Sequence, residues 1–115
     1  MEAFDKVAAE TPGYIAASLV DLESGMTLGL KSARQDFDLA AASAYNSEMV
    51  KQKLKIMKAL NLRTTLEDML ITLGDQIHVI KMVSPTTFIY LSVDRSQSNL
   101  AIVRNVLNKH VAAFL

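Results

Sequence analysis

Three pairs of neighbouring carboxylates are the first residues whose type and spacing could serve chemistry. They are Asp21 with Glu23, Asp36 with Asp38, and Glu67 with Asp68. General acid–base catalysis needs two carboxylates that occupy different environments and face one cleft. Carboxylates this close together near turns are explained more simply as solvating or capping groups, so we expect no catalysis from them.

The remaining single residues of chemical interest also favour structural roles. Asp94 stands where a strand is expected to lead into a helix, and there it can cap the helix or pair with Arg95. His78 and His110 have no second metal-type ligand at a telling spacing, and motifs such as HExxH are absent. We therefore expect no metal and no other cofactor, and structural or surface roles for both histidines.

The sequence motifs of nucleotide binding and of serine hydrolysis are missing. The chain has no GxxxxGK[ST] loop and no Gly-x-Ser-x-Gly nucleophile elbow. It has no cysteine, which excludes disulfides and thiolate metal sites. The sequence therefore predicts a protein that is not an enzyme, and any nucleotide involved in its function would be held by a partner.

Four lysines between residues 51 and 58 form the one concentration of charge. Lys51, Lys55 and Lys58 share a helix face at spacings i, i+4 and i+7, and Glu48 partly balances them. Two interpretations stay open, namely a solvated face, which we favour, and a docking surface for an acidic partner. Nucleic acid is not an expected partner, because Lys plus Arg equal Asp plus Glu at twelve each and no aromatic residue alternates with the lysines.

Length and composition favour one cytoplasmic domain spanning residues 1–115. The first ten residues lack the basic start and the apolar segment of a signal peptide. No apolar run is long enough to cross a bilayer, so no membrane insertion is expected. Hydrophobic residues make up 50% of the chain, which indicates more apolar surface than a small core can bury.

Apolar spacing predicts an α/β (α+β) fold with the order α-β-β-α-β-β-β-α. Helices are expected over residues 1–10, about 37–60 and about 98–115, the last capped by Ser96 or Ser98. Strands are expected over residues 14–21, 26–31, 66–73, 76–83 and 87–93. The strands are apolar on both faces, so helices must cover both sides of one sheet.

The expected middle helix has a wider apolar face than one packing partner requires. Its apolar residues fill an arc of roughly 160°, whereas a helix packed on one partner needs about 100°. These residues are Met49, Val50, Leu54, Ile56, Met57 and Leu60. The helix is therefore expected to have two packing partners, for example a sheet and another helix.

Several segments of the chain resemble the Roadblock / dynein light-chain family, in its bacterial, MglB-like branch. The resemblance covers nearly the whole chain and is diffuse, because it concerns packing rather than chemistry. It is carried by the turn at Ser24-Gly25, by Leu70-Ile71-Thr72, and by the segment from Val93-Asp94-Arg95 to Asn99-Leu100-Ala101. The resemblance implies regulation or scaffolding of small Ras-like GTPases, without an arginine finger and without catalytic residues.

The same resemblance implies a five-stranded antiparallel sheet, with the long helix on one face and the two terminal helices on the other. It also implies a homodimer that pairs the third strand and the long helix of two copies. Residues 66–73 would then form an edge strand, and Met69, Leu70 and Ile71 have no proline or lysine among them to prevent pairing. The predicted dimer interface comprises Leu66, Met69, Leu70, Ile71, Leu73, Met49, Ile56 and Leu60.

Residues and resemblance together predict a non-catalytic homodimeric adaptor or regulator that binds a small Ras-like GTPase. It would modulate the nucleotide cycle of the GTPase, by favouring one nucleotide-dependent shape, or its localisation. Lys51, Lys55 and Lys58 are the possible docking residues. Two alternatives stay open: a small-ligand sensor built from the same layers, and a structural light chain associated with a motor.

Overall fold

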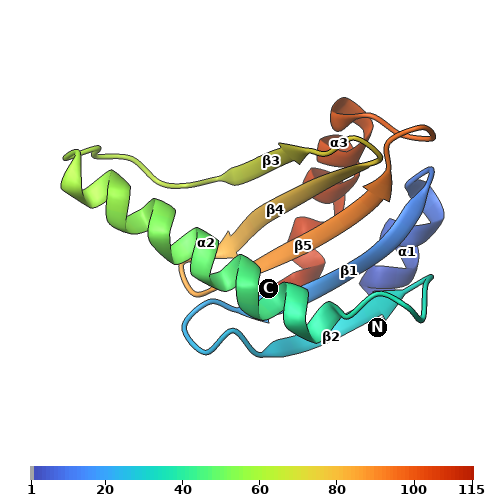
Figure 1. Cartoon of the computed structure of the whole chain (residues 1–115), viewed down its shortest axis with the longest axis horizontal. Helices are drawn as coiled ribbons and strands as arrows, with labels where there is room; N and C mark the ends of the chain where they lie inside the picture. Colours follow the sequence, from blue (N-terminus) through green and yellow to red (C-terminus); the bar gives the residue numbers. More distant parts are fainter. Residues whose placement is uncertain (1) are drawn as a thin grey trace.

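The computed structural model describes residues 2–115 as one five-stranded antiparallel sheet between two helical layers (Figure 1). The helices are α1 (Glu2–Glu10), α2 (Leu39–Ala59) and α3 (Leu100–His110), and a 3₁₀ turn follows at Val111–Phe114. The strands are β1 (Tyr14–Asp21), β2 (Thr27–Ser32), β3 (Asp68–Thr72), β4 (Gln76–Ser84) and β5 (Thr87–Asp94). This order confirms the predicted fold class.

The strands lie side by side in the order β2-β1-β5-β4-β3, so β2 and β3 are the two edges of the sheet. The interior strands β1 and β5 are buried along nearly their whole length. Their sequences are almost continuously apolar, as is typical of strands that helices cover on both faces. The third strand in chain order is an edge strand, as predicted, although it is shorter than residues 66–73.

The two faces of the sheet carry separate core clusters, as the predicted layers require. α1 and α3 cover one face and α2 crosses the other (Figure 1). The cluster under α1 and α3 includes Phe4, Val7, Leu91, Val103, Leu107 and Phe114. The cluster under α2 includes Ile15, Val20, Val50, Phe88 and Tyr90.

Side-chain caps fix the starts of α2 and α3. The Asp38 carboxylate accepts a hydrogen bond from the backbone N–H of Ala41, and the Asn99 side chain accepts one from Ile102. The predicted cap of α3 at Ser96 or Ser98 is therefore wrong. Ser96 instead donates its hydroxyl to Asp94 Oδ1 at 2.7 Å, and the buried Ser98 hydroxyl has no partner among residues 2–115. Asn99 has the extended backbone that an N-cap requires.

The C-terminal half of α2 extends beyond the sheet. Small residues in its first half allow close approach, and the hydroxyl oxygens of Ser43 and Ser18 of β1 lie 3.0 Å apart. Further along, the helix and its connection to β3 project from the body of the molecule (Figure 1). With this projection the molecule measures 39 × 26 × 25 Å. Within residues 2–115, no helix is both long and apolar enough to cross a membrane.

Candidate protein–protein interface

Apolar side chains run along the flank of α2 that does not face the sheet. Tyr45, Met49, Ile56 and Leu60 lie within ~60° of one another around the helix axis, and we name them the α2 stripe. Tyr45 is 77% exposed, Ile56 39% and Leu60 64%. Met49 is partly buried against the core cluster under α2. The helix therefore has apolar surface well outside its contact with the sheet.

The edge strand β3 carries further exposed apolar side chains. Leu70 and Leu73 are 38% and 41% exposed. Ile71 pairs with His78 of β4 and is partly buried. The pairing with β4 uses one side of the β3 backbone, and no strand of residues 2–115 occupies the other side. This edge is open to another strand.

The eight residues predicted for a dimer interface therefore fall into two groups in the single subunit. Ile56, Leu60, Leu70 and Leu73 are exposed. Leu66, Met69 and Met49 pack partly against the core under α2, and Ile71 is partly buried. Leu66 and Leu73 flank β3 rather than lie in it, although the backbone bonds Met82 N–H to Glu67 C=O and Leu73 N–H to Gln76 C=O continue the pairing with β4.

Two exposed apolar residues of this surface were not predicted. Tyr45 lies one helical turn before Met49, and extending the same spacing backwards would have found it. Leu62 is 49% exposed and lies in the irregular connection between α2 and β3. No periodicity could have found Leu62, because such a segment has none.

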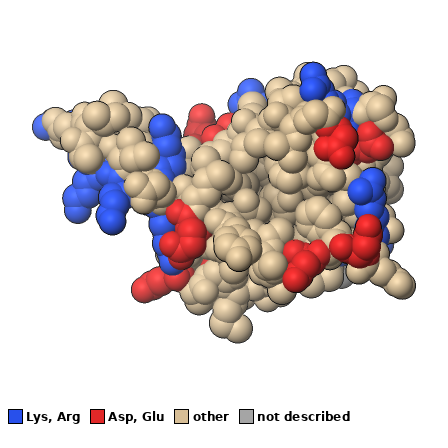
Figure 2. Space-filling model, viewed as in Figure 1, with Lys and Arg blue, Asp and Glu red and all other residues tan. Residues whose placement is uncertain are grey.

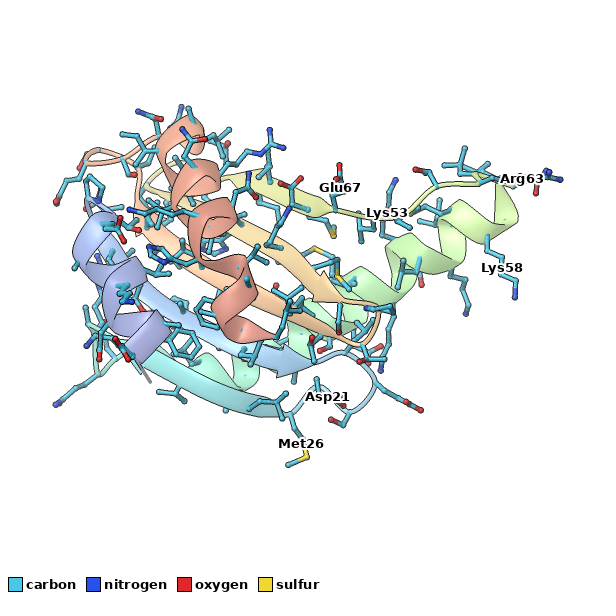
Figure 3. The ribbon with its side chains drawn as sticks, turned by 180° about the vertical axis from the view of Figure 1, so that it is seen from behind. Asp21, Met26, Lys53, Lys58, Arg63 and Glu67 are labelled. Atoms are coloured by element: carbon cyan, nitrogen blue, oxygen red, sulfur yellow. The ribbon has the colours of Figure 1, made fainter. Side chains whose placement is uncertain are left out.

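The predicted lysine face lies on the other flank of α2, toward the β1–β2 turn. Lys51 Nζ donates to the carbonyl oxygen of Glu23 at 2.7 Å and contacts Glu48 Oε1 at 3.5 Å. Lys55 and Lys58 are exposed. Basic side chains gather on the projecting end of α2, and Figure 3 labels Lys58 and Arg63 there (Figures 2 and 3). A partner that covered the α2 stripe would leave the lysine face accessible.

His78 belongs to a polar group on the α2 side of the sheet. Its Nε2 atom lies 2.7 Å from Gln76 Oε1, and its ring nitrogens lie 3.3 and 3.4 Å from the Tyr90 hydroxyl. Burial lowers the pKa of His78 and raises the pKa of Tyr90 to about 12. The neutral forms of both side chains are therefore favoured. Among residues 2–115, no three His, Cys, Asp or Glu side chains are grouped as metal ligands.

His110 joins the two terminal helices. Its Nε2 atom contacts Glu10 Oε2 of α1, and Lys109 Nζ contacts the other oxygen of the same carboxylate. Hydrogen bonds from Lys109 and His110 lower the pKa of Glu10. This cluster ties α1 to α3 on the face of the sheet opposite α2, which is a structural role.

One carboxylate of each pair considered for catalysis has a structural role instead, namely Asp21 in a turn, Asp38 in the cap of α2 and Asp68 in an ion pair. Asp21 Oδ2 accepts from the N–H and the hydroxyl of Ser24 at 3.0 and 2.6 Å, and Asp94 accepts from Ser96 in the same way. These hydrogen bonds lower the pKa values of Asp21 and Asp94. Arg95 donates to the carbonyl oxygen of Leu73 at 3.1 Å, and Arg104 of α3 binds Asp68 at 3.2 Å. Asp94 therefore has a structural role, but it stabilises the turn before α3 and neither caps that helix, which Asn99 does, nor forms the expected pair with Arg95.

A pocket of about 460 Å³ lies between the C-terminal half of α2 and the adjoining ends of β3 and β4. Its apolar wall includes Leu54, Leu66 and Met82, and Glu67 and Lys81 stand at its polar side. The pocket could admit a small apolar group.

Solved structures with this architecture include MglB and Roadblock/LC7 proteins. An MglB with tetrameric arrangement is 16% identical, over 98% of this chain and 82% of its own, with a TM-score of 0.86. The gliding protein MglB from Thermus thermophilus is 16% identical over 98% and 83%, with a TM-score of 0.83. A Roadblock/LC7 domain from Streptomyces avermitilis is 11% identical over 95% and 88%, with a TM-score of 0.82. The chain has the Roadblock/LC7 fold.

The overall sequence similarity of the chain to these proteins is low, at 11–16% identity. No protein-family model matches the chain, and no curated protein matches it. The fold implied by the sequence resemblance is nonetheless confirmed, because the matches cover nearly all of the chain. In this chain the Roadblock/LC7 fold leaves the α2 stripe and the β3 edge uncovered on the single subunit.

Proposed function

We propose that the chain is a Roadblock-family adaptor that pairs with a second copy of itself and regulates a small Ras-like GTPase without performing chemistry. The observation that carries this proposal is the α2 stripe beside the open β3 edge. Leu60 and Tyr45 are more than half exposed, and soluble proteins normally cover an apolar edge of this kind. The shared fold with MglB, solved in one case as a tetrameric arrangement, supports self-association.

Two subunits would pair antiparallel through β3 and thereby join their sheets. The unpaired N–H and C=O groups of each edge would bond to the other copy. The two α2 stripes would then cover each other on one side of the joined sheet. A stable interface buries roughly 800 Å² per partner, and a 21-residue helix together with an edge strand can supply such an area. Each subunit would contribute the same two surfaces, its β3 edge and its α2 stripe, as two-fold symmetry requires.

The GTPase would bind to a surface that this pairing leaves free. Lys55 and Lys58 are exposed on the flank of α2 away from the stripe, where they would attract an acidic surface and accelerate association. Regulation then requires different affinities for the GDP and GTP forms of the GTPase. A protein that binds both forms equally does not change the balance between them.

The dimer is tested with Ile71→Lys, which places a charge in the paired strand. We expect light scattering to show a shift from dimer to monomer, because a buried ammonium in the interface is costly. Leu60→Lys gives an independent test, since Leu60 is 64% exposed and the subunit should fold normally. Leu115→Lys is the matched control, at an 80% exposed residue following α3. An unchanged dimer in both test variants would place the interface elsewhere.

The GTPase claim is tested by titrating purified Ras-like GTPases, loaded with GDP or with a GTP analogue, into the protein. We expect preference for one form, and a loss of about tenfold in affinity at low salt in Lys55→Glu/Lys58→Glu. Light scattering should show that this double variant remains a dimer. Equal binding to both nucleotide forms, or no binding, would contradict the regulatory function.

A small-ligand sensor is the second candidate, and the pocket beside Leu54 and Leu66 is the observation that favours it. A ligand bound there would raise the melting temperature, and the rise would continue to grow with the logarithm of the free ligand concentration above saturation. A screen of small apolar acids and alcohols that leaves the melting temperature unchanged would remove this candidate.

A further inference from the structure

Three exposed apolar side chains lie in or directly before β2, the edge of the sheet opposite β3. Met26, Leu28 and Leu30 are 66%, 57% and 53% exposed, and Met26 points away from the body of the molecule (Figure 3). A single exposed leucine needs no explanation. Three apolar side chains within five residues, beside the free edge of a strand, form a patch of the kind that binds partners. We name these three residues the β2 edge strip.

The backbone of β2 presents free hydrogen-bonding groups beside this strip. The N–H of Ala33 donates to the carbonyl oxygen of Ile15 at 2.7 Å, which fixes the alternation along the β1–β2 pair. Since alternate residues of an antiparallel pair bond to the partner strand, the N–H and C=O groups of Leu30 and Ser32 point away from β1. No strand of residues 2–115 lies on that side.

The usual protections of an edge strand are weak in the second half of β2. Natural edges are blocked by lysine, by proline or by bulges. The irregular register at Leu19 and Val20 lies beside the first half of β2 only. Lys31 is the one charged residue of the strand, and its Nζ atom binds Asp5 Oδ1 of α1 at 2.6 Å. The ammonium is therefore held on the α1 side of the sheet rather than across the edge.

We propose that the β2 edge binds an extended segment of another protein, which adds to the sheet as a further strand. In this mode the main chain supplies affinity and alternate side chains supply specificity. A six-residue strand with two exposed leucines, preceded by Met26, is small against the roughly 800 Å² per partner of a stable dimer. It suits a short segment better than a whole subunit.

A second copy of this chain is a poor occupant of the same edge. If β3 pairs as proposed above, β2 pairing with β2 would extend the sheet at both ends without closure and produce fibres. This step rests on the proposed dimer, so the test includes a variant in which that dimer is broken.

The surroundings of the strip define the chemistry of the segment. Leu30 pairs with Ser18, whose hydroxyl contacts Ser43 of α2, so Leu30 projects on the α2 side of the sheet. The segment should therefore carry apolar side chains at alternate positions on that side. Arg34 is exposed just past the end of β2, and a carboxylate at the corresponding end of the segment would meet it.

The probe is a phage-displayed library of random peptides, about twelve residues long, selected on the full chain. We expect the selected peptides to share alternating apolar residues and an acidic end. On binding the synthetic peptide, hydrogen exchange should slow at the amides of Leu30 and Ser32. Leu28→Lys and Leu30→Lys should each weaken binding about tenfold with an unchanged melting temperature, while Leu115→Lys binds normally.

Several outcomes would overturn the proposal. The selection could recover no peptide, or Leu30→Lys could bind the peptide as tightly as the wild type. Alternatively, the peptide could slow hydrogen exchange only in strands other than β2. An oligomer that Leu30→Lys dissolves and Ile71→Lys leaves intact would instead assign the edge to a second copy. Ile71→Lys should bind the peptide normally, so that failure of the β3 dimer and failure of the β2 site are distinguishable.

Discussion

The two faces of the sheet differ in how completely helices cover them. On one face α1, α3 and the 3₁₀ turn close over the core, where the rings of Phe4 and Phe114 meet edge to face at 4.9 Å and Glu10 contacts Lys109 and His110. On the other face α2 covers only part of the sheet and leaves Tyr45 and Leu60 exposed. We infer a division of roles, in which the closed face stabilises the subunit and the open face leaves exposed the apolar surface that the proposed function uses for binding.

Substitution of a core residue on the closed face should give the largest effect. Phe4→Ala removes a fully buried ring and should lower the free energy of unfolding by about 3–5 kcal/mol. Leu60→Ala on the open face should change it by less than about 0.5 kcal/mol. Urea denaturation measures both, in the Ile71→Lys background so that self-association does not contribute. Similar losses for the two substitutions would contradict the division of roles.

Much of this fold was predictable, because long apolar runs leave few alternatives. Residues 14–21 were predicted as a strand with the bounds that β1 has, and α2 differs from the predicted helix by one or two residues at each end. The cap of α3 was predicted wrongly at Ser96 or Ser98, because Asn99 has an equally suitable side chain. In the folded turn Ser96 binds Asp94, and Asn99 caps the helix. The hydrogen-bond partners of these side chains depend on the folded turn and cannot be deduced from the local sequence.

The candidate interfaces were less predictable than the fold, because exposure depends on the order of strands in the sheet. The alternation of Leu28 and Leu30 is that of a half-buried strand, and only the edge position of β2 shows that no helix covers them. The β3 edge was anticipated through the family resemblance. The lysine face was found directly from helical spacing, because such spacing is a local property of the chain.

The N-cap of α3 provides a smaller test of the closed face. Asn99→Ala removes the side chain that accepts from Ile102 N–H and should cost about 1 kcal/mol in the free energy of unfolding. Asn99→Asp should retain most of that stability, because it also accepts the hydrogen bond. Ser98→Ala is the matched control, since the Ser98 hydroxyl has no partner among the described residues and its loss should be neutral or stabilising. Thermal denaturation that ranks Ser98→Ala below Asn99→Ala would contradict this assignment of the cap.

The smallest expected effect is the pH dependence contributed by His78 on the open face. Burial lowers the pKa of His78 in the folded chain, so the unfolded chain binds a proton more readily as the pH falls through about 6.5. The free energy of unfolding should therefore decrease from about pH 7.5 to about pH 5.5. His78→Gln should flatten this decrease, whereas His110→Gln on the closed face should retain it. The carboxyls of Glu10, Asp21 and Asp94 do not interfere, because their lowered pKa values keep them ionised in this window.

The same measurement can show whether a partner covers the α2 face. His78 lies beside Ile71 of the edge strand and beside Tyr90 under the α2 layer. A second subunit or a GTPase bound over this region would remove more water from the imidazole and lower its pKa further. Protonation of His78 at acidic pH would then weaken the association as well as the fold. The dimer would dissociate more readily near pH 5.5 than near pH 7.5. A dissociation constant that stays the same between these two pH values, in wild type and in His78→Gln alike, would mean that the partner covers another part of the molecule.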